Sequence, residues 1–138
     1  MKAANEAGLA EHNRVRDLHI NTPSMVQGLK QTTDAQAYAE KLARDWDGKS
    51  IMTVLHHAPN KDRPGQGENL AANWESSPAA ACKMATNQWY DEIKDYNYAR
   101  PGFAMNTGHF TQVNDEVISC LMIYIYISYI NIIFLYLN

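Results

Sequence analysis

The sequence predicts one α+β domain with layered helices and strands, rather than a parallel α/β sheet. The chain has 138 residues, which is enough for a single domain with its own core. Apolar residues recur at helical spacing in three segments, and a short β-type run separates the second segment from the third. Loops rich in proline, glycine and asparagine divide these elements, and the sequence contains no repeat of fixed period.

Three helices follow from the apolar periodicity. The first is expected over residues 4–19, the second from about residue 33 to Gly48, and the third from Pro78, with Ser77 as its N-cap. The positions expected to face the core are Leu9, Val15 and Leu18 in the first helix, Tyr38, Leu42 and Trp46 in the second, and Ala81, Ala85, Trp89 and Ile93 in the third.

Strand and loop signals lie between the helices. Residues 68–74 are expected to form a modest strand. Residues 51–55 are apolar or β-branched and fit either a strand or a short helical turn. Residues 57–67 and 101–109 contain prolines and glycines, so both are expected to be loops.

The last 22 residues, 117–138, carry no charge, whereas every charged side chain lies at or before Glu116. A membrane anchor, a core strand and translated noncoding sequence all stay open as explanations. The segment lacks flanking Lys or Arg, which argues against an anchor, and it lacks a turn signal, which argues against strands of ~5–6 residues. Its abundant Ile, Tyr, Asn, Leu and Phe have AT-rich codons. We therefore expect residues 1–116 to form the domain and 117–138 to be a separate tail, either a read-through artefact or a tail anchor.

Composition narrows the classes of partner and compartment. The net charge is −3, with 12 basic and 15 acidic residues and no basic run, so nucleic acid is not an expected partner. Cys82 and Cys120 are expected to be inert buried thiols rather than a disulfide. The N-terminal segment is polar and lacks the apolar stretch of a secretory signal, and Lys2 stands where N-myristoylation requires glycine.

Four residues in distinctive short segments are the candidates for chemistry: His57 in HHAP, Glu68 in GQGENL, Glu92 in WYDEIKDY and His109 in TGHFTQ. Imidazole nitrogens and carboxylate oxygens are the ligands that zinc prefers, and they are also the usual general acids and bases. Each residue alone is weak evidence, and of His56 and His57 only one is expected to take part, because neighbours on an extended segment face opposite ways. The sequence has no HExxH, CxxC, glycine-rich phosphate loop or GxSxG.

Several segments in order resemble the CAP superfamily of cysteine-rich secretory proteins, antigen 5 and pathogenesis-related proteins, and in particular its Golgi-associated plant pathogenesis-related branch. The matching segments run from His12 to Val113, about three-quarters of the chain. They are HNRVRDLH, AQAYAEKLA, LHHAP, GQGENLA, QWYDEIKDYNY, RPGF and TGHFTQV.

The resemblance implies an α-β-α sandwich with a central cleft. It places His57 and His109 as the residues that hold a weakly bound Zn²⁺ at an open site, with the carboxylates of Glu68 and Glu92 nearby. Asn69 and Gln112 would support these groups by hydrogen bonds. In the family, further strands follow the segment TGHFTQV, but here unrelated sequence begins at Asn114. The sandwich is therefore expected to lack its last strands and to keep an unpaired sheet edge.

Three functions remain open. The first is a non-enzymatic module that binds a lipid or sterol and associates with membranes, with Tyr96, Tyr98 and Phe103 as the candidate lipid contacts. Alternatively, these aromatic residues only pack the third helix onto the sheet. The second function is a zinc-dependent hydrolase or peptidase that uses the same His and Glu residues. The third is a truncated isoform without function.

Partners and location follow from the resemblance. A lipid or membrane surface is the expected partner, together with a second copy of the chain in a homodimer. The expected location is the cytosolic side of Golgi or other membranes if the N-terminus is complete, and extracellular if a signal peptide is missing.

Overall fold

The computed structural model describes residues 2–20, 22, 24, 33–48, 50–62, 65, 67–114, 120–127 and 130–137. At residues 2, 33–36 and 39, and in the two C-terminal strands, only the backbone is described. The helices are α1 (Lys2–Arg16), α2 (Thr33–Asp45), α3 (Pro78–Asp91) and α4 (Gly108–Val113), and the strands are β1 (Gly67–Asn73), β2 (Cys120–Ile127) and β3 (Ile130–Leu137). Three short 3₁₀ turns are η1 (Ile51–Thr53), η2 (Asn60–Asp62) and η3 (Glu92–Asp95).

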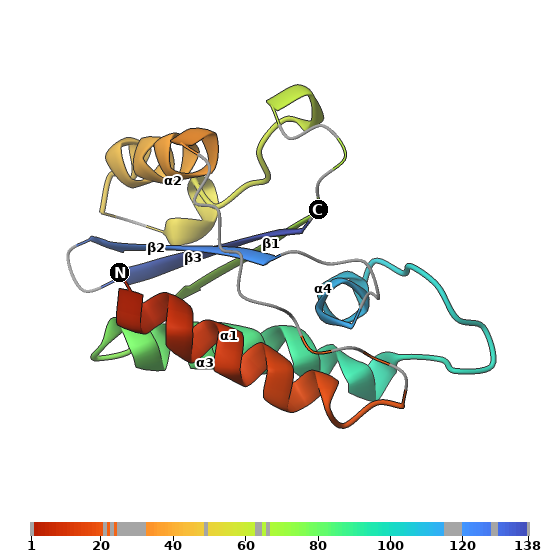
Figure 1. Cartoon of the computed structure of the whole chain (residues 1–138). Helices are drawn as coiled ribbons and strands as arrows, with labels where there is room; N and C mark the ends of the chain where they lie inside the picture. Colours follow the sequence, from red (N-terminus) through yellow and green to blue (C-terminus); the bar gives the residue numbers. More distant parts are fainter. Residues whose placement is uncertain are drawn as a thin grey trace.

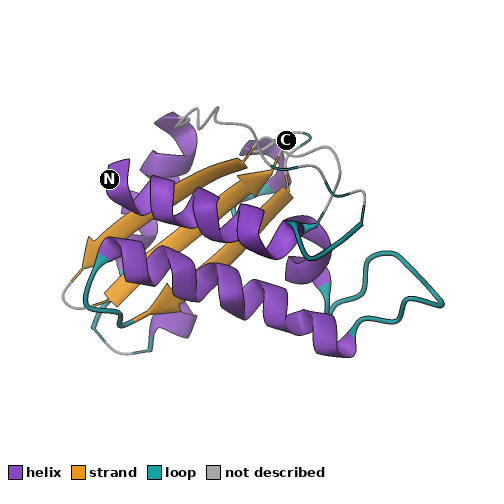
Figure 2. Cartoon of the chain, turned by 60° about the horizontal axis from the view of Figure 1, so that its bottom comes forward, coloured by secondary structure: helices purple, strands orange, loops and turns teal. Residues whose placement is uncertain are grey.

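The elements form three layers, which confirms the α-β-α sandwich predicted from the sequence. Helices α1 and α3 lie side by side and cover one face of the sheet, while α2 covers the other face (Figures 1 and 2). Helix α4 packs against α3 and β1 at one end of the sandwich. Among the described residues, no helix has the length and apolar character required to cross a bilayer.

The sheet has the strand order β1-β3-β2 in the described part of the chain, and both pairings are antiparallel. Strand β3 pairs with β1 from Gly67↔Leu137 to Asn73↔Asn131, and with β2 from Cys120↔Leu137 to Ile127↔Ile130. Strands β1 and β2 are thus the two edges of this sheet.

The segment 117–138 is where the structure differs most from expectation. We expected its uniform apolar character to disfavour strands, yet 16 of its residues form β2 and β3. The central strand β3 contacts α2 on one side of the sheet and α3 on the other. A strand covered on both faces has no polar side to alternate with, so a continuous apolar run suits it. Two statements about this segment remain predictions: that it arose by read-through, and that it is a unit separate from the domain.

The core joins α1, α3, β1 and α4 through mostly small side chains packed around Trp89. Val15, Ala81, Ala85 and Trp89 are buried as predicted. Leu18 is 63% exposed, contrary to prediction, because α1 ends at Arg16. The other buried residues of this cluster are Ala4, Ala71, Cys82 and Val113.

Local chemistry explains two other elements. The Ser77 hydroxyl accepts a hydrogen bond from the Ala80 N–H at 3.2 Å, and Pro78 is the first residue of α3, as the sequence predicts. Residues 51–53 adopt the helical turn rather than the strand, and Ile51 is buried.

Cys82 is a free, buried thiol as predicted, and its burial raises its pKa to about 12. The side chain of Cys120 lies outside the described residues.

Candidate functional site

His57 and Glu68 form the first of two histidine–carboxylate pairs. The Nδ1 atom of His57 lies 2.5 Å from Oε2 of Glu68, and the same carboxylate accepts a hydrogen bond from the Ala58 N–H at 3.1 Å. The Glu68 side chain on β1 is fully buried, whereas the His57 side chain in the preceding loop is 54% exposed. A fixed, buried carboxylate therefore orients an imidazole ring that solvent can reach.

Glu92 and His109 form the second pair, and Glu92 also caps the N-terminus of α4. One carboxylate oxygen lies 2.7 Å from His109 Nδ1, and the other accepts hydrogen bonds from the His109 and Phe110 N–H groups at 2.9 and 3.1 Å. These amides belong to the first turn of α4, where N–H groups have no partner within the helix. The side chain of the N-cap residue, Thr107, makes no capping bond. Glu92 thus replaces the missing cap with a full negative charge.

Arg16 holds the opposite end of α4, a role that the sequence analysis did not identify. Its Nη1 atom donates a hydrogen bond to the Val113 carbonyl at 2.7 Å, and the residue is 1% exposed. A helix of six residues is too short to be stable alone, so contacts at both ends decide its position. Nothing in the local pattern around Arg16 distinguishes it from the exposed Arg14.

His12 is a second buried polar residue outside the predicted set. Its Nδ1 atom lies 2.9 Å from the Gly8 carbonyl and 3.1 Å from the Thr86 hydroxyl, which joins α1 to α3. Burial lowers its pKa to about 4, so the ring is neutral in the folded protein at neutral pH. His12 is therefore a structural residue of the helix interface.

Asn69 and Gln112 were predicted to support the cleft by hydrogen bonds, and the structure gives each of them a different set of neighbours. The Asn69 amide donates to the His109 carbonyl at 3.2 Å and so ties β1 to α4. Gln112 is among the residues that line a cavity beside α4. The Asn69 Oδ1 and Gln112 Oε1 atoms are buried and have no hydrogen-bond partner in the described part of the protein.

The four predicted cleft residues are thus joined as two pairs. Within the described ranges, no three His, Cys, Asp or Glu side chains are placed to share one metal ion. Each pair separately has the arrangement of a metal-binding histidine, because a carboxylate holds Nδ1 and leaves Nε2 to bind a ligand. His56 differs, since its Nδ1 lies 2.7 Å from the Tyr38 hydroxyl. Imidazole and carboxylate groups are of the kind that zinc prefers, but the roles of His57 and His109 as ligands of one ion stay predictions.

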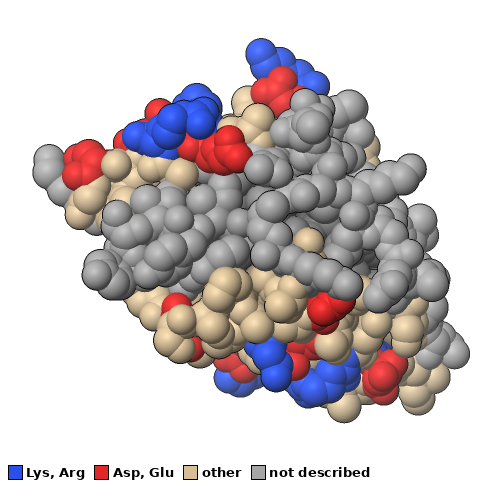
Figure 3. Space-filling model, turned by 60° about the vertical axis from the view of Figure 1, so that its left-hand side comes forward, with Lys and Arg blue, Asp and Glu red and all other residues tan. Residues whose placement is uncertain are grey.

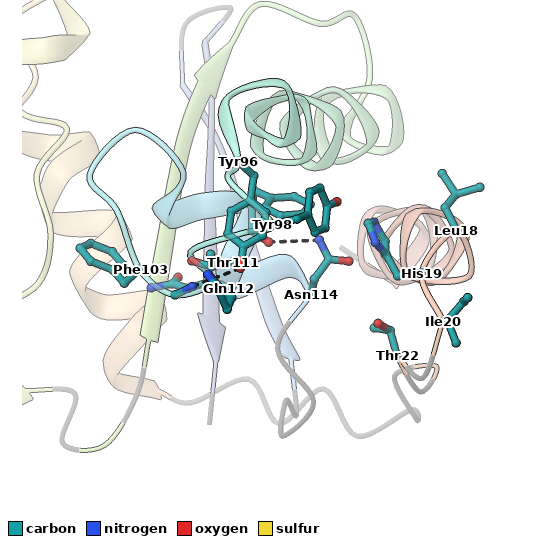
Figure 4. Close-up of a pocket in the computed structure, with 13 residues that line it drawn as sticks. Leu18, His19, Ile20, Thr22, Tyr96, Tyr98, Phe103, Thr111, Gln112 and Asn114 are labelled. Carbon is teal, nitrogen blue, oxygen red and sulfur yellow. Dashed lines mark hydrogen bonds between the residues drawn. The ribbon is translucent and has the colours of Figure 1, made fainter.

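A cavity of about 730 Å³ opens between the residues after α1, the loop that follows η3, and α4 (Figure 4). Tyr96, Tyr98 and Phe103, the three residues predicted to contact lipid, all line it. Leu18 and Ile20 from the segment after α1 form the opposite wall. The three aromatic residues therefore share one cavity, and their contact with lipid stays a prediction.

Aromatic contacts build the inner wall of this cavity. The Tyr96 ring packs on Phe110 with centroids 5.0 Å apart and meets Tyr98 edge-on at 4.9 Å. The Tyr96 hydroxyl also accepts a hydrogen bond from the Gly102 N–H at 3.2 Å, which closes the loop. Gly108 leaves room for the loop, because a Cβ atom there would lie 2.9 Å from the Phe103 ring.

Comparison with known proteins places the chain in a family. It is 38% identical over 103 residues to the human Golgi-associated plant pathogenesis-related protein 1, and 35% identical over 103 residues to protein PRY2 of Saccharomyces cerevisiae. The fold matches the crystal structures of Na-ASP-1, with a TM-score of 0.65 at 20% identity, and of NaASP2 with Zn²⁺, with a TM-score of 0.66 at 16% identity. The chain belongs to the CAP superfamily.

These matches differ in how much of each protein they cover. The alignments span 75% of this CAP chain but only 60% of the human relative and 26% of the yeast relative. The structural matches cover 99% of the chain and 38% of Na-ASP-1, and 100% of the chain and 80% of NaASP2. No family model matches the chain. These matches place the chain in the family. They do not show that the chain has the activity or the partners of the full-length relatives.

The charges of this CAP chain are mixed on the face shown in Figure 3, where acidic and basic side chains lie beside one another at both ends of the view. Elsewhere in the described chain, opposite charges also pair within one helix or turn, such as Arg14 with Glu11 at 2.7 Å and Lys94 with Asp91 at 2.5 Å. No single-sign field covers the described residues of this face. The exclusion of nucleic acid remains an expectation from composition.

Proposed function

We propose that this CAP chain is a non-enzymatic module that binds a lipid or sterol and associates with membranes. The observation that carries the proposal is the cavity between α1 and α4. Its volume of about 730 Å³ lies within the range of small-molecule sites, which are mostly apolar with a few polar groups. Aromatic and aliphatic side chains supply most of its lining, and hydroxyl and amide groups supply the rest.

The exposure of the lining supports uptake from a membrane. Leu18, Ile20, Tyr98 and Phe103 are 63%, 92%, 63% and 71% exposed, and they come from two opposite walls. Exposed apolar side chains that gather around a pocket mark interaction surfaces, because water solvates them poorly. A membrane surface is therefore the partner that this proposal implies. The predicted homodimer stays a prediction.

The His–Glu pairs support a secondary, metal-binding role. His57 and His109 would hold the ion through Nε2, and Glu68 and Glu92 would fix the two rings. One structural neighbour was crystallised with Zn²⁺, which favours zinc as the first metal to test. Two histidines without a third protein ligand would bind zinc weakly, and ligation requires neutral rings, so acid should oppose binding.

The alternative function is a zinc-dependent hydrolase, which the same two pairs favour. The ion would supply an acidic water, and Glu68 or Glu92 would accept its proton. Both carboxylates already accept backbone N–H bonds, from Ala58 and from the first turn of α4, so a proton-accepting role would compete with these contacts. Hydrolysis of a peptide or ester library that persists with a chelator and in His109→Ala would exclude this mechanism.

Binding of a fluorescent sterol and of anionic liposomes tests the main proposal. We expect Tyr98→Ala to weaken both, because it removes an aromatic wall of the cavity. The matched control is Trp74→Ala, which removes an aromatic side chain that is 66% exposed and lies outside the cavity lining. The proposal is wrong if the wild-type chain binds neither probe, or if both variants lose binding equally.

A further inference from the structure

His19 lies where a change of charge would act on the cavity. Of the described lining residues, it is the one whose side chain titrates between about pH 5 and 8. The residue follows the end of α1, and its ring lies among the cavity residues in Figure 4. Its Nε2 atom is 2.9 Å from the Tyr90 hydroxyl, and its ring centroid is 5.6 Å from that of Tyr90 and 5.8 Å from that of Phe110. These contacts fix the ring in the cavity wall.

The groups around His19 do not stabilise a positive charge. On α3, Tyr90 is a phenol whose pKa is raised by burial, and Tyr96 and Tyr98 line the cavity with phenol rings as well. Helix α4 contributes the apolar Phe110 and the neutral Thr111, Gln112 and Asn114.

The charged neighbours on the histidine's own segment are engaged elsewhere. Arg16 donates to the Val113 carbonyl, and Asp17 accepts a hydrogen bond from Ser24 at 3.3 Å. Burial lowers the pKa of His19 below its usual value of 6.5. The neutral ring is therefore the resting form at neutral pH.

We propose that His19 makes the cavity sensitive to pH, so that an uncharged apolar ligand occupies it when the ring is neutral and leaves when the ring is protonated. The inference rests on the proposed function, because it concerns the same cavity. An apolar ligand would remove water from the ring and would leave an imidazolium without solvation or a carboxylate partner. The ligand thus binds the neutral form selectively, and protonation competes with binding.

The sign and size of the effect follow from this competition. Binding is at full strength above the His19 pKa of the free protein, which lies below 6.5, and it weakens as the pH falls through that value. Each further pH unit lowers the affinity about tenfold. Membranes bathed in acidic fluid would therefore release or exclude the ligand, and neutral conditions would favour uptake.

The test uses dehydroergosterol, a fluorescent sterol that carries no titratable group, so that only the protein titrates. Its affinity is measured for the full chain between about pH 7.5 and 5.0, for His19→Gln, and for the control His56→Gln. We expect the wild type and His56→Gln to lose affinity with acid, and His19→Gln to bind equally across the range. Circular dichroism at each pH identifies any loss of fold, which must be checked because protonation of His12 destabilises the protein as the pH falls below about 6.5.

The outcomes separate the two proposals. Absence of wild-type binding at pH 7.5 overturns the proposed function and this inference together. Binding at pH 7.5 that does not change with acid overturns this inference alone. An unchanged pH dependence in His19→Gln also overturns it, because the titrating group would then lie elsewhere.

Discussion

The aromatic cavity and the two His–Glu pairs are assembled in different ways, although the cavity and the Glu92–His109 pair both use helix α4. Each pair joins residues 11 or 17 positions apart through one short contact. The cavity walls come from three segments spread over most of the domain, and α4 supplies Phe110 and Gln112 to it. The pairs do not gather three ligands in the described part of the protein, whereas the cavity is continuous. The proposed ligand site is therefore the cavity, and of the two pairs it is Glu92–His109 that positions a helix of its wall.

The largest expected effect comes from removing residues 117–138. Strand β1 carries Glu68 and Asn69, and in the described sheet its strand partner is β3. A fragment of residues 1–116 leaves β1 without that pairing and exposes apolar faces of α2 and α3, so we expect it to be unstable or to aggregate. Thermal unfolding followed by circular dichroism is the measurement. A cooperative transition of the fragment would show that the helices around the cavity do not need the sheet.

Arg16→Ala is expected to destabilise both regions through α4. The change leaves the buried Val113 carbonyl without its guanidinium donor and opens a void, so we expect a loss of about 3 kcal/mol. Denaturant unfolding measures it. Arg14→Ala is the matched control, since Arg14 is 53% exposed and its pair with Glu11 is worth less than about 1 kcal/mol. Equal losses in the two variants would contradict the role of Arg16.

Acid should destabilise the α1–α3 interface through His12. The folded pKa of His12 is about 4, against about 6.5 in the unfolded chain, so the unfolded state takes up a proton first as the pH falls. This contribution to stability is present above pH 6.5 and is lost between pH 6.5 and about 4, to a total of about 3 kcal/mol. Unfolding measured across this range should be less pH-dependent in His12→Gln. An identical slope in that variant would assign the effect to other groups.

Glu92→Gln and Glu68→Gln compare the two pairs directly. Each variant keeps a hydrogen-bonding group and removes one negative charge beside a histidine. Glu92→Gln also weakens the cap of α4, and we expect it to lower stability by about 1 kcal/mol and to reduce sterol binding several-fold. Glu68→Gln should leave sterol binding unchanged, because Glu68 contacts the loop at residues 57–58 instead. Equal binding losses would mean that both pairs support the cavity.

The parts of the fold that depend on local chemistry could be predicted from the sequence. Ser77 and Pro78 set the start of α3, and Val15, Ala85 and Trp89 follow helical spacing into the core. Leu18 fits the same spacing but lies beyond the end of α1, because periodicity does not fix where a helix stops. Strands β2 and β3 could not be separated within their apolar run, since both faces of β3 are covered and no alternation remains.

For the candidate site, too, the sequence reveals local features but not the contacts between distant segments. His57, Glu68, Glu92 and His109 stand out in distinctive segments, and Tyr96, Tyr98 and Phe103 could be chosen as an amphipathic group. Which histidine meets which carboxylate depends on how the loops return to β1 and α4. Arg16 and His19 were missed because their importance comes from contacts with Val113 and Tyr90, which are far away in the sequence.

Photocrosslinking with a photoactivatable sterol tests the central claim most directly, because it reports where the ligand lies. Irradiated protein is digested, and the labelled peptides are identified by mass spectrometry. Labels on the segments at residues 18–22, 96–103 and 110–114 are the predicted result. Labels confined to residues 56–68, or label on no peptide despite binding, would contradict the assignment of the cavity as the binding site.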